Sequence, residues 1–400
     1  MELPPPLGRA RRDPIVLLVT GRTAVSRIGG MTAVGRHVAT AIKLGLEPMV
    51  LFPPSMRALG AEIAGELDGR ARSMPADTLG DQAGGNDDLV LVVAADWYIS
   101  PRATMEFVEE TDGRAVARFK ERNREVAPLA RLPVKQLRRL IDDLADNASG
   151  EIINRACGRE AAVFTLDVSQ RHRLSDNVAV ERAETKLFGR THTNAAGPEL
   201  GFVQKRISIP ITRRLAGTRV VPMHVCAAKV ALGLASAWVL AGGGYMAGLV
   251  GAVAFFFSQV LDGVASQLAR ATLRDSSQGE KADFASDIIL HLALLWALAT
   301  ATGTTLAAAV AAVGLLVSAW LAHSRVLARL WALRAAGRLY QVAPDPPASR
   351  FANREGTAYG LLLAALVARF DLFLLAAALV NHMVYAAAWL LTERGRRWQA

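Results

Sequence analysis

Three aspartates in the second half of the chain have the residue type and the spacing for cation chemistry. Asp262 lies late in one apolar run, and Asp283 and Asp287 lie at the start of the next. Asp283 and Asp287 are four residues apart, so they share one helical face, and the short connection makes the two helices antiparallel neighbours. Carboxylates in or beside membrane spans are costly and usually functional. Hard oxygen ligands without Cys or His favour Mg²⁺ or Mn²⁺, so we predict a metal site here.

Apolar runs fill the half of the chain that carries these acids. Hydrophobic residues make up 52% of the sequence, and charge is dense before residue 220 and sparse after it. Since a spanning helix needs about 20 mostly apolar residues, we predict an all-α domain of six transmembrane helices over residues 218–394. The spans are expected at Val221–Ala241, Tyr245–Leu268, Phe284–Thr302, Thr305–Leu327, Tyr359–Ala368 extended on either side, and Leu372–Leu391.

Basic residues between the runs predict the orientation of the spans. Arg and Lys concentrate in the connections 270–281 and 325–354 and in the C-terminal tail, whereas the intervening connections carry one or none. Both termini are therefore expected in the cytoplasm, in a multi-pass protein of the cell membrane. The same bias accounts for the net charge of +10, so we expect a lipid bilayer and no nucleic acid as partner.

A different pattern precedes the first span, over residues 201–217. Its apolar residues mostly share one helical face, and its basic residues flank that face. The apolar set is Phe202, Val203, Ile207, Ile211 and Leu215, and the basic set is Lys205, Arg206, Arg213 and Arg214. A helix of this kind lies in the membrane interface, and Pro210 would kink it. An ordinary linker helix is the alternative.

The first half, residues 14–175, alternates strand-like apolar runs with helical stretches, which is typical of a Rossmann-like α/β domain. Buried parallel strands are expected at Ile15–Thr20, Pro48–Phe52, Leu89–Ala95 and Ala161–Asp167. Helices are expected at Met31–Leu44, Arg102–Glu110 and Val134–Ala145. We interpret 69–88 as a loop, 176–200 as a polar linker, and 1–13 as a disordered N-terminus without the apolar core of a signal peptide.

Weaker candidates for chemistry lie in this α/β domain. The first strand leads into Gly21 and Arg22 and then into the pair Gly29–Gly30. A glycine-containing turn after the first strand is where α/β folds bind phosphates. Asp96 follows the third strand, where it would cap the next helix. Gly21 and Arg22 are therefore candidate nucleotide-binding residues.

The aspartates belong to a longer pattern that resembles the CDP-alcohol phosphotransferases. That family carries D-x2-D-G-x2-A-R-x8-G-x3-D-x3-D across its second and third spans. The positions that match are Asp262, Ala269, Arg270, Gly279, Asp283 and Asp287. Two positions depart, since Ala265 and Ser266 stand where the family has Asp and Gly. The resemblance covers roughly residues 201–394.

The resemblance implies a metal-dependent transfer of a phospho-alcohol from a CDP-alcohol to a hydroxyl, with release of CMP, in phospholipid or polar-lipid synthesis. Two divalent ions on the carboxylates would hold the diphosphate, and Asp287 would be the general base. Arg270, Gly279 and Lys281 would contact substrate. Family members often form homodimers.

The layout also resembles fusions of inositol-phosphate cytidylyltransferase with di-myo-inositol-phosphate-phosphate synthase, which implies a nucleotidyltransferase-type head. The same resemblance implies a metal-binding Asp at the position of Asp96, which adds Asp96 to the candidate nucleotide-binding residues. The turn after the first strand lacks the Lys that such heads carry, so we expect a degenerate head. Two other classes remain open. One is a catalytically inactive relative, a scaffold or binding protein, because Ala265 cannot bind a metal. The other is a small-solute transporter that uses Lys229 and Asn381–His382.

Overall fold

The computed structural model describes residues 14–78, 85, 87–110, 115–121, 124–142, 149–158, 161–167, 170–190, 202–274, 277–317 and 354–380. The chain divides into two compact units, Met1–Leu187 and Phe188–Ala400. The α/β unit is the first, and the helical unit is the second. The expected N-terminal tail, 1–13, and the pair Asn381–His382 lie outside the described residues.

A seven-stranded sheet with the order β10-β8-β9-β6-β1-β4-β5 forms the centre of the α/β unit. Its strands are β1 (Pro14–Leu18), β4 (Glu47–Phe52), β5 (Arg72–Pro75), β6 (Leu89–Ala94), β8 (Ala115–Glu121), β9 (Arg124–Pro133) and β10 (Ala162–Thr165). Two small antiparallel pairs join β2 (Arg27–Ile28) to β3 (Met31–Thr32), and β7 (Trp97–Ile99) to β11 (Arg171–Arg173).

The α/β prediction is confirmed, with corrections to the strands. Three of the four apolar runs expected as buried parallel strands form β1, β4 and β6, which pair in parallel with β1 between the others. The sheet is nevertheless mixed, because β9 runs antiparallel to both β6 and β8. Strand β10 is an edge strand with Val163 56% exposed, so it is not buried as expected. Strand β5 lies inside the segment interpreted as a loop.

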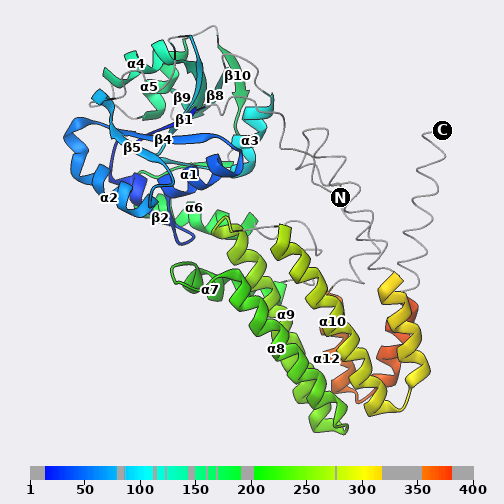
Figure 1. Ribbon diagram of the computed structural model, residues 1–400. Coiled ribbons are helices and arrows are strands. Elements are labelled where there is room, and N and C mark those ends of the chain that lie inside the picture. Colours follow the sequence, from blue (N-terminus) through cyan, green and yellow to red (C-terminus); the bar gives the residue numbers. More distant parts are fainter. Residues whose placement is uncertain are drawn as a thin grey trace, which may run out of the picture. The chain divides into compact units, whose positions relative to one another are not determined.

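Helices pack against both faces of this sheet (Figure 1). They are α1 (Ala33–Lys43), α2 (Arg57–Leu67), α3 (Pro101–Glu110), α4 (Val134–Asp142) and α5 (Ser149–Cys157). Thr32 begins α1 by accepting a hydrogen bond from Gly35 N at 3.1 Å on its side-chain oxygen, which satisfies a backbone donor of the first turn. The helices expected at 31–44, 102–110 and 134–145 form α1, α3 and α4. Helix α1 begins later than expected, because Met31–Thr32 form β3, and residues 143–145 lie outside the described residues.

The segment expected as a polar linker contains a helix, α6 (Asn177–Arg190). Asp176 caps it, since its carboxylate accepts a hydrogen bond from Ala179 N at 2.7 Å. The capping bond holds the pKa of Asp176 below its usual range. Ala183 and Phe188 are fully buried. A cap and buried apolar side chains are sufficient for a helix where polar composition alone suggested a linker.

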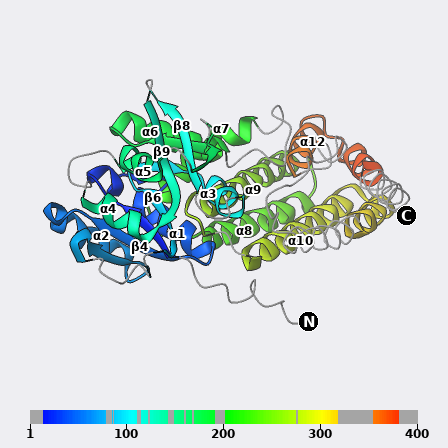
Figure 2. The ribbon, with the colours of Figure 1, turned by 90° about the horizontal axis from the view of Figure 1, so that it is seen from above.

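The helical unit contains α7 (Phe202–Ala216), α8 (Pro222–Ala241), α9 (Tyr245–Ala271), α10 (Ser277–Thr302) and α12 (Arg354–Leu366). Helices α8, α9 and α10 run side by side in both ribbon views (Figure 2). Three stretches are long and apolar enough to cross a membrane: Pro222–Ala241, Tyr245–Ala271 and Lys281–Thr302. Thr305–Val317, Gly356–Leu366 and Phe370–Val380 are shorter apolar helices. Within the described residues, three helices are thus able to cross a membrane by length and composition, and the count of six spans stays a prediction.

Glycines let the long helices approach closely. A Cβ built on Gly251 of α9 would lie 2.5 Å from Leu240 Cγ of α8, and one on Gly233 of α8 would lie 2.6 Å from Leu290 Cδ2 of α10. Ser236 Oγ also donates to Gly251 O at 2.7 Å. These contacts fix α8 against both of its neighbours, and the polar site described next is built from these same three helices.

Helix α7, expected at 201–217, packs on α9 through a polar face. Gln267 of α9 donates from Nε2 to Ser208 Oγ at 2.6 Å and accepts from Thr212 Oγ1 at 2.8 Å. Ser208 and Thr212 are buried, whereas Val203 is 49% exposed. Buried amide and hydroxyl groups need such partners, so this network sets how α7 packs on α9. The interfacial location of α7 stays a prediction.

Candidate functional site

The three aspartates come together, as their spacing predicts. Asp262 projects from α9, and Asp283 and Asp287 project from the first turns of α10. One carboxylate oxygen from each residue lies within 4.8 Å of the other two. Asp262 and Asp287 are each 8% exposed. This acid triad (Asp262, Asp283 and Asp287) has the ligand type and the geometry that could hold a metal ion.

A lysine lies among the same oxygens. Lys229 projects from α8 and is fully buried. Its ammonium donates hydrogen bonds to Asp262 Oδ1 at 2.6 Å, Asp283 Oδ1 at 2.8 Å and Asp287 Oδ1 at 2.6 Å. An ammonium has three donors, and here each of these bonds ends on a different carboxylate. Lys229 is therefore the positive centre of the triad.

This arrangement bears on the two divalent ions that the resemblance implies. Three carboxylates and one ammonium carry a formal net charge of −2, which a single divalent ion balances. The fourth carboxylate of the motif is absent, because Ala265 occupies its position. The residues present therefore fit one Mg²⁺ or Mn²⁺ ion and do not fit two.

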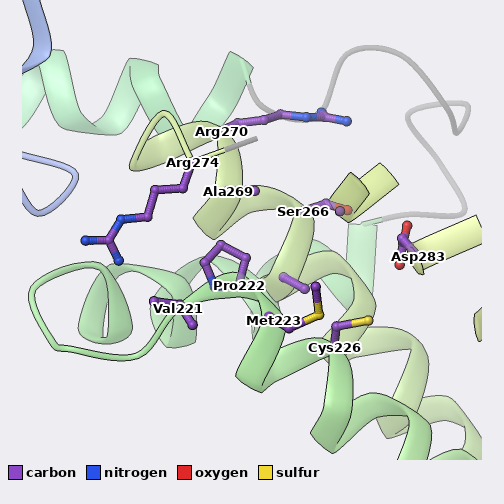
Figure 3. Close-up of a pocket in the computed structure, with 11 residues that line it drawn as sticks. Val221, Pro222, Met223, Cys226, Ser266, Ala269, Arg270, Arg274 and Asp283 are labelled. Carbon is purple, nitrogen blue, oxygen red and sulfur yellow. The ribbon is translucent and has the colours of Figure 1, made fainter. Parts of the chain in front are cut away.

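A cavity of about 350 Å³ opens beside the triad (Figure 3). It lies where the start of α8, the end of α9 and the start of α10 meet. It is lined by Val221, Pro222, Met223, Cys226, Ala265, Ser266, Ala269, Arg270, Arg274, Gly279 and Asp283. Asp283 links the cavity to the triad. The volume is in the range of small-molecule sites, and the lining combines an apolar wall with cationic and anionic groups.

The residues expected to contact substrate separate into two groups. Arg270 and Gly279 line the cavity, whereas Lys281 is exposed and does not appear in its lining. Arg274, which the sequence reading did not select, also lines it. The guanidinium groups of Arg270 and Arg274 point in different directions in Figure 3. They place positive charge at the rim and do not form a closed phosphate clamp in this structure.

The end of α9 brings Arg274 to the cavity. Arg274 N donates to Ala269 O at 2.8 Å, and Leu273 adopts a left-handed conformation with φ of 53°. This bond closes the helix in a Schellman-type turn, where glycine is the usual left-handed residue. A leucine in this conformation is strained. Arg274 thus lies directly after the last turn of α9, where positive charge favours the helix dipole.

The α/β unit brings its candidate residues to one edge of the sheet. Gly21 follows β1 and Asp96 follows β6, and these parallel strands are neighbours with Leu18 opposite Ala94. Arg22 is exposed.

Asp96 is 7% exposed, and its Oδ2 lies 4.0 Å from Arg173 Nε. Asp96 does not cap the following helix, because strand β7 comes next along the chain. Ser100 caps the following helix α3 instead, since its hydroxyl accepts a hydrogen bond from Ala103 N at 3.2 Å.

The glycine pair at 29–30 is also placed differently from the expected phosphate turn. Gly29 and Gly30, with φ of 57° and 81°, form the turn of the β2–β3 hairpin. Gly29 N donates to Glu184 Oε1 of α6 at 3.1 Å. The backbone N–H of Gly29, which a phosphate-binding turn would offer to a ligand, thus donates to the carboxylate of Glu184 in this structure.

Two buried basic side chains of α1 lie near this edge. His37 Nε2 donates to Trp97 O at 2.7 Å, and Arg36 Nη1 donates to Ile28 O at 3.1 Å. Burial lowers the pKa of His37 to about 4, and the charge on Arg36 adds to the effect, although the bond to Trp97 opposes it. His37 is therefore neutral at pH 7 and links α1 to β7.

Lys229 is the site residue whose role the sequence reading missed. From the sequence it is a polar residue in the first span, which suits only the transporter alternative. A single lysine in an apolar helix is itself a signal, because a buried charge needs a partner. The motif residues all lie on α9 and α10, so their spacing could not predict a partner on α8.

No protein-family model and no curated protein matches the sequence. Several solved structures are similar to part of the chain. One is 4-diphosphocytidyl-2C-methyl-D-erythritol synthase from Anaerococcus prevotii, at 11% identity and a TM-score of 0.33 over 44% of this chain and 98% of that one. Another, also a 4-diphosphocytidyl-2C-methyl-D-erythritol synthase, has 13% identity and a TM-score of 0.34 over 44% and 99%. Similarity this low carries no conclusion about what the chain binds.

Proposed function

We propose that this chain is an integral membrane CDP-alcohol phosphotransferase that moves a phospho-alcohol from a CDP-alcohol to an acceptor hydroxyl and releases CMP, in phospholipid or polar-lipid synthesis. The observation that carries the proposal is the acid triad, whose oxygens lie within 4.8 Å of one another beside a cavity with two arginines at its rim. The motif spacing in α9 and α10 supports the same reaction. The multi-pass topology with cytoplasmic termini, and a homodimer, are further parts of the proposal.

The chemistry assigned to the chain is a displacement at phosphorus. The acceptor oxygen forms a bond to the phosphorus that carries the alcohol, the bond from that phosphorus to the bridging oxygen breaks, and CMP leaves with the electron pair. Asp287 takes the proton of the acceptor hydroxyl, and Arg270 and Arg274 attract the diphosphate. One Mg²⁺ or Mn²⁺ held by carboxylate oxygens of Asp262, Asp283 and Asp287 other than the three bonded to Lys229 would supply charge neutralisation when bound.

A second function is favoured by a specific observation. Ala265 removes a carboxylate from the motif, and Lys229 forms hydrogen bonds to the three that remain. Such a site suits a catalytically inactive relative that binds a phosphate-bearing lipid or nucleotide in the cavity, or that serves as a scaffold. The two functions make the same prediction for binding and opposite predictions for turnover.

The deciding experiment measures CMP release by membranes that contain the full chain, with Mg²⁺ and a panel of CDP-diacylglycerol, CDP-glycerol and CDP-choline. Asp287→Asn is expected to lower turnover by about 100-fold or more, since it removes the general base. Asp371→Asn is the matched control, because this carboxylate pairs with Arg369 at an exposed position outside the triad. Unchanged turnover in Asp287→Asn would contradict the assigned role, and no CMP release from any donor would favour the inactive relative.

Binding can be tested separately through the two cysteines of the chain. Cys226 lines the cavity, whereas Cys157 is buried in the α/β unit. N-ethylmaleimide is expected to label Cys226 first, and a CDP-alcohol bound in the cavity should slow that labelling by about tenfold at saturating concentration. Equal labelling rates with and without every donor of the panel would contradict binding at this cavity.

For the α/β unit we propose a nucleotidyltransferase-like fold that has lost nucleotidyl transfer. Gly21 and Asp96 lie at one edge of the sheet, as a nucleotide site would need. The turn after β1 has no Lys, however, and the first basic residue that follows β1 is the exposed Arg22. Titration of the full chain with CTP and Mg²⁺ tests this proposal, with Asp96→Asn as the variant. Tight CTP binding that Asp96→Asn abolishes would contradict the loss of function.

A further inference from the structure

A fully buried lysine within an apolar helix needs a physical account. Lys229 has no exposed side-chain surface, and its ammonium forms hydrogen bonds of 2.6–2.8 Å to one oxygen of each acid in the triad. Moving an ammonium out of water costs several kcal/mol unless opposite charge surrounds it. The three carboxylates provide that charge, and they in turn would repel one another without a cation. The lysine and the triad therefore stabilise each other.

The position of the ammonium coincides with the place of a cation. A small divalent ion held by Asp262, Asp283 and Asp287 through these same oxygens would lie about 2.1 Å from each. Lys229 Nζ lies 2.6–2.8 Å from those three atoms. Two positive centres cannot share one coordination point, so the ammonium and such an ion exclude each other there.

We propose that Lys229 is a built-in cation that takes the place of one divalent ion in the acid triad. Charge supports this assignment. A four-carboxylate motif has a formal charge of −4, which two divalent ions balance. In this chain Ala265 removes one negative charge and Lys229 adds one positive charge, which leaves −2. Both changes reduce the demand for external cation, and together they equal the charge of one divalent ion.

The proposal concerns cation occupancy and does not require phosphoryl transfer, so its test and the CMP assay can fail independently. The full chain, purified in detergent and stripped with EDTA, is titrated with Mn²⁺ by calorimetry, and bound Mn²⁺ is counted by electron paramagnetic resonance. Lys229→Met keeps the length of the side chain and removes its charge. This variant is expected to bind an additional Mn²⁺ ion per chain, about a hundredfold tighter than wild type binds it.

Two matched variants control for loss of charge and for substitution at this position. Lys205→Met removes a lysine from α7, outside the triad, and is expected to bind Mn²⁺ as wild type does. Lys229→Arg keeps the positive charge on α8 and is expected to gain no ion. A gain of Mn²⁺ in Lys229→Met alone supports the proposal, whether wild type binds one ion or none. Equal Mn²⁺ occupancy in wild type and Lys229→Met overturns it.

Lys229→Met removes the ammonium to which all three carboxylates bond, two of them buried, and so risks failing to fold. The double variant Lys229→Met/Asp283→Asn avoids this risk, because two carboxylates without the ammonium restore the formal charge of −2 found in the wild-type site. It keeps an oxygen ligand at residue 283 and removes the ammonium. With the formal charge held at that of wild type, an Mn²⁺ ion is still expected to enter the place that Lys229 Nζ occupies in wild type. Mn²⁺ occupancy no higher than that of wild type in this variant would overturn the proposal.

Discussion

The two units of the chain treat buried charge in opposite ways. In the α/β unit, the buried basic side chains Arg36 and His37 donate to separate backbone carbonyls, and burial keeps His37 neutral. In the helical unit, Lys229 and the acid triad concentrate one positive and three negative charges within hydrogen-bonding distance. Backbone carbonyls can satisfy a buried donor at modest cost. A cluster of full charges costs far more unless it is completely balanced.

This difference separates groups that serve the fold from groups suited to chemistry. The bonds of Arg36 and His37 hold α1 to neighbouring strands, as many buried polar groups do. The cluster around Lys229 retains excess negative charge beside a cavity, which no packing requirement explains. The candidate chemistry of this chain therefore lies in the helical unit, and variants in both units test this difference.

The largest contrast is expected between Lys229→Met and Arg36→Met in EDTA. Lys229→Met should lower the free energy of unfolding by about 3–5 kcal/mol, because it removes the ammonium that bonds to two buried carboxylates and one half-buried carboxylate. Arg36→Met should cost about 1–3 kcal/mol, mainly through the carbonyl left without its donor. Thermal unfolding of the full chain in detergent measures the loss of stability in each variant. Hydrogen exchange assigns each loss to the α/β unit or to the helical unit. An equal decrease in the free energy of unfolding for Lys229→Met and Arg36→Met would show that the two kinds of buried charge contribute equally to stability.

A pH dependence is expected from His37 in the α/β unit. Its pKa in the folded chain is about 4, below the ordinary value of 6.5, so between these values the unfolded state binds more protons. Stability should therefore be complete above pH 6.5 and fall by about 3 kcal/mol as the pH decreases to 4. Hydrogen exchange of α1 and β7 as a function of pH measures this slope, and His37→Gln should reduce it. An unchanged slope in His37→Gln would assign the effect to other groups.

Packing in the α/β unit can be tested within one helix. A Cβ on Gly60 of α2 would overlap the ring of Phe52, whereas one on Gly65 meets no neighbouring atom within 4 Å. Gly60→Ala should destabilise the unit by about 1–3 kcal/mol, and Gly65→Ala should stabilise it by about 1 kcal/mol. Denaturant unfolding of the full chain compares them. Similar effects would show that α2 can shift away from β4.

The smallest effects concern left-handed residues at two helix ends. Leu273, at the end of α9, has φ of 53°, and Asp68, at the end of α2, has φ of 47°. Leu273→Gly should stabilise the helical unit by about 1 kcal/mol. Asp68→Gly should change the α/β unit by only a few tenths of a kcal/mol, since Asp tolerates this conformation. Thermal unfolding tests the pair, and a larger gain from Asp68→Gly would locate the strain in the α/β unit instead.

Local sequence patterns predicted much of the architecture. Short Val- and Leu-rich runs gave β1, β4 and β6, because a strand buried on both faces must be apolar throughout. The strands β8 and β9 were missed, since they mix Arg and Glu with apolar residues and derive their position from pairing within the sheet. Helix α6 was not predicted, because the polar composition of residues 176–200 suggested a linker although Asp176 is a suitable N-cap residue.

The sequence by itself determined that Asp262, Asp283 and Asp287 would meet, because helical periodicity and a short connection leave antiparallel helices little other arrangement. Only the tertiary structure decided what lies between them. Lys229 is 33 residues from Asp262 and 58 from Asp287 along the chain, and it reaches both because close packing at glycines fixes how α8 contacts α9 and α10. Periodicity describes one helix at a time, whereas a partner on a third helix depends on how helices are rotated against each other.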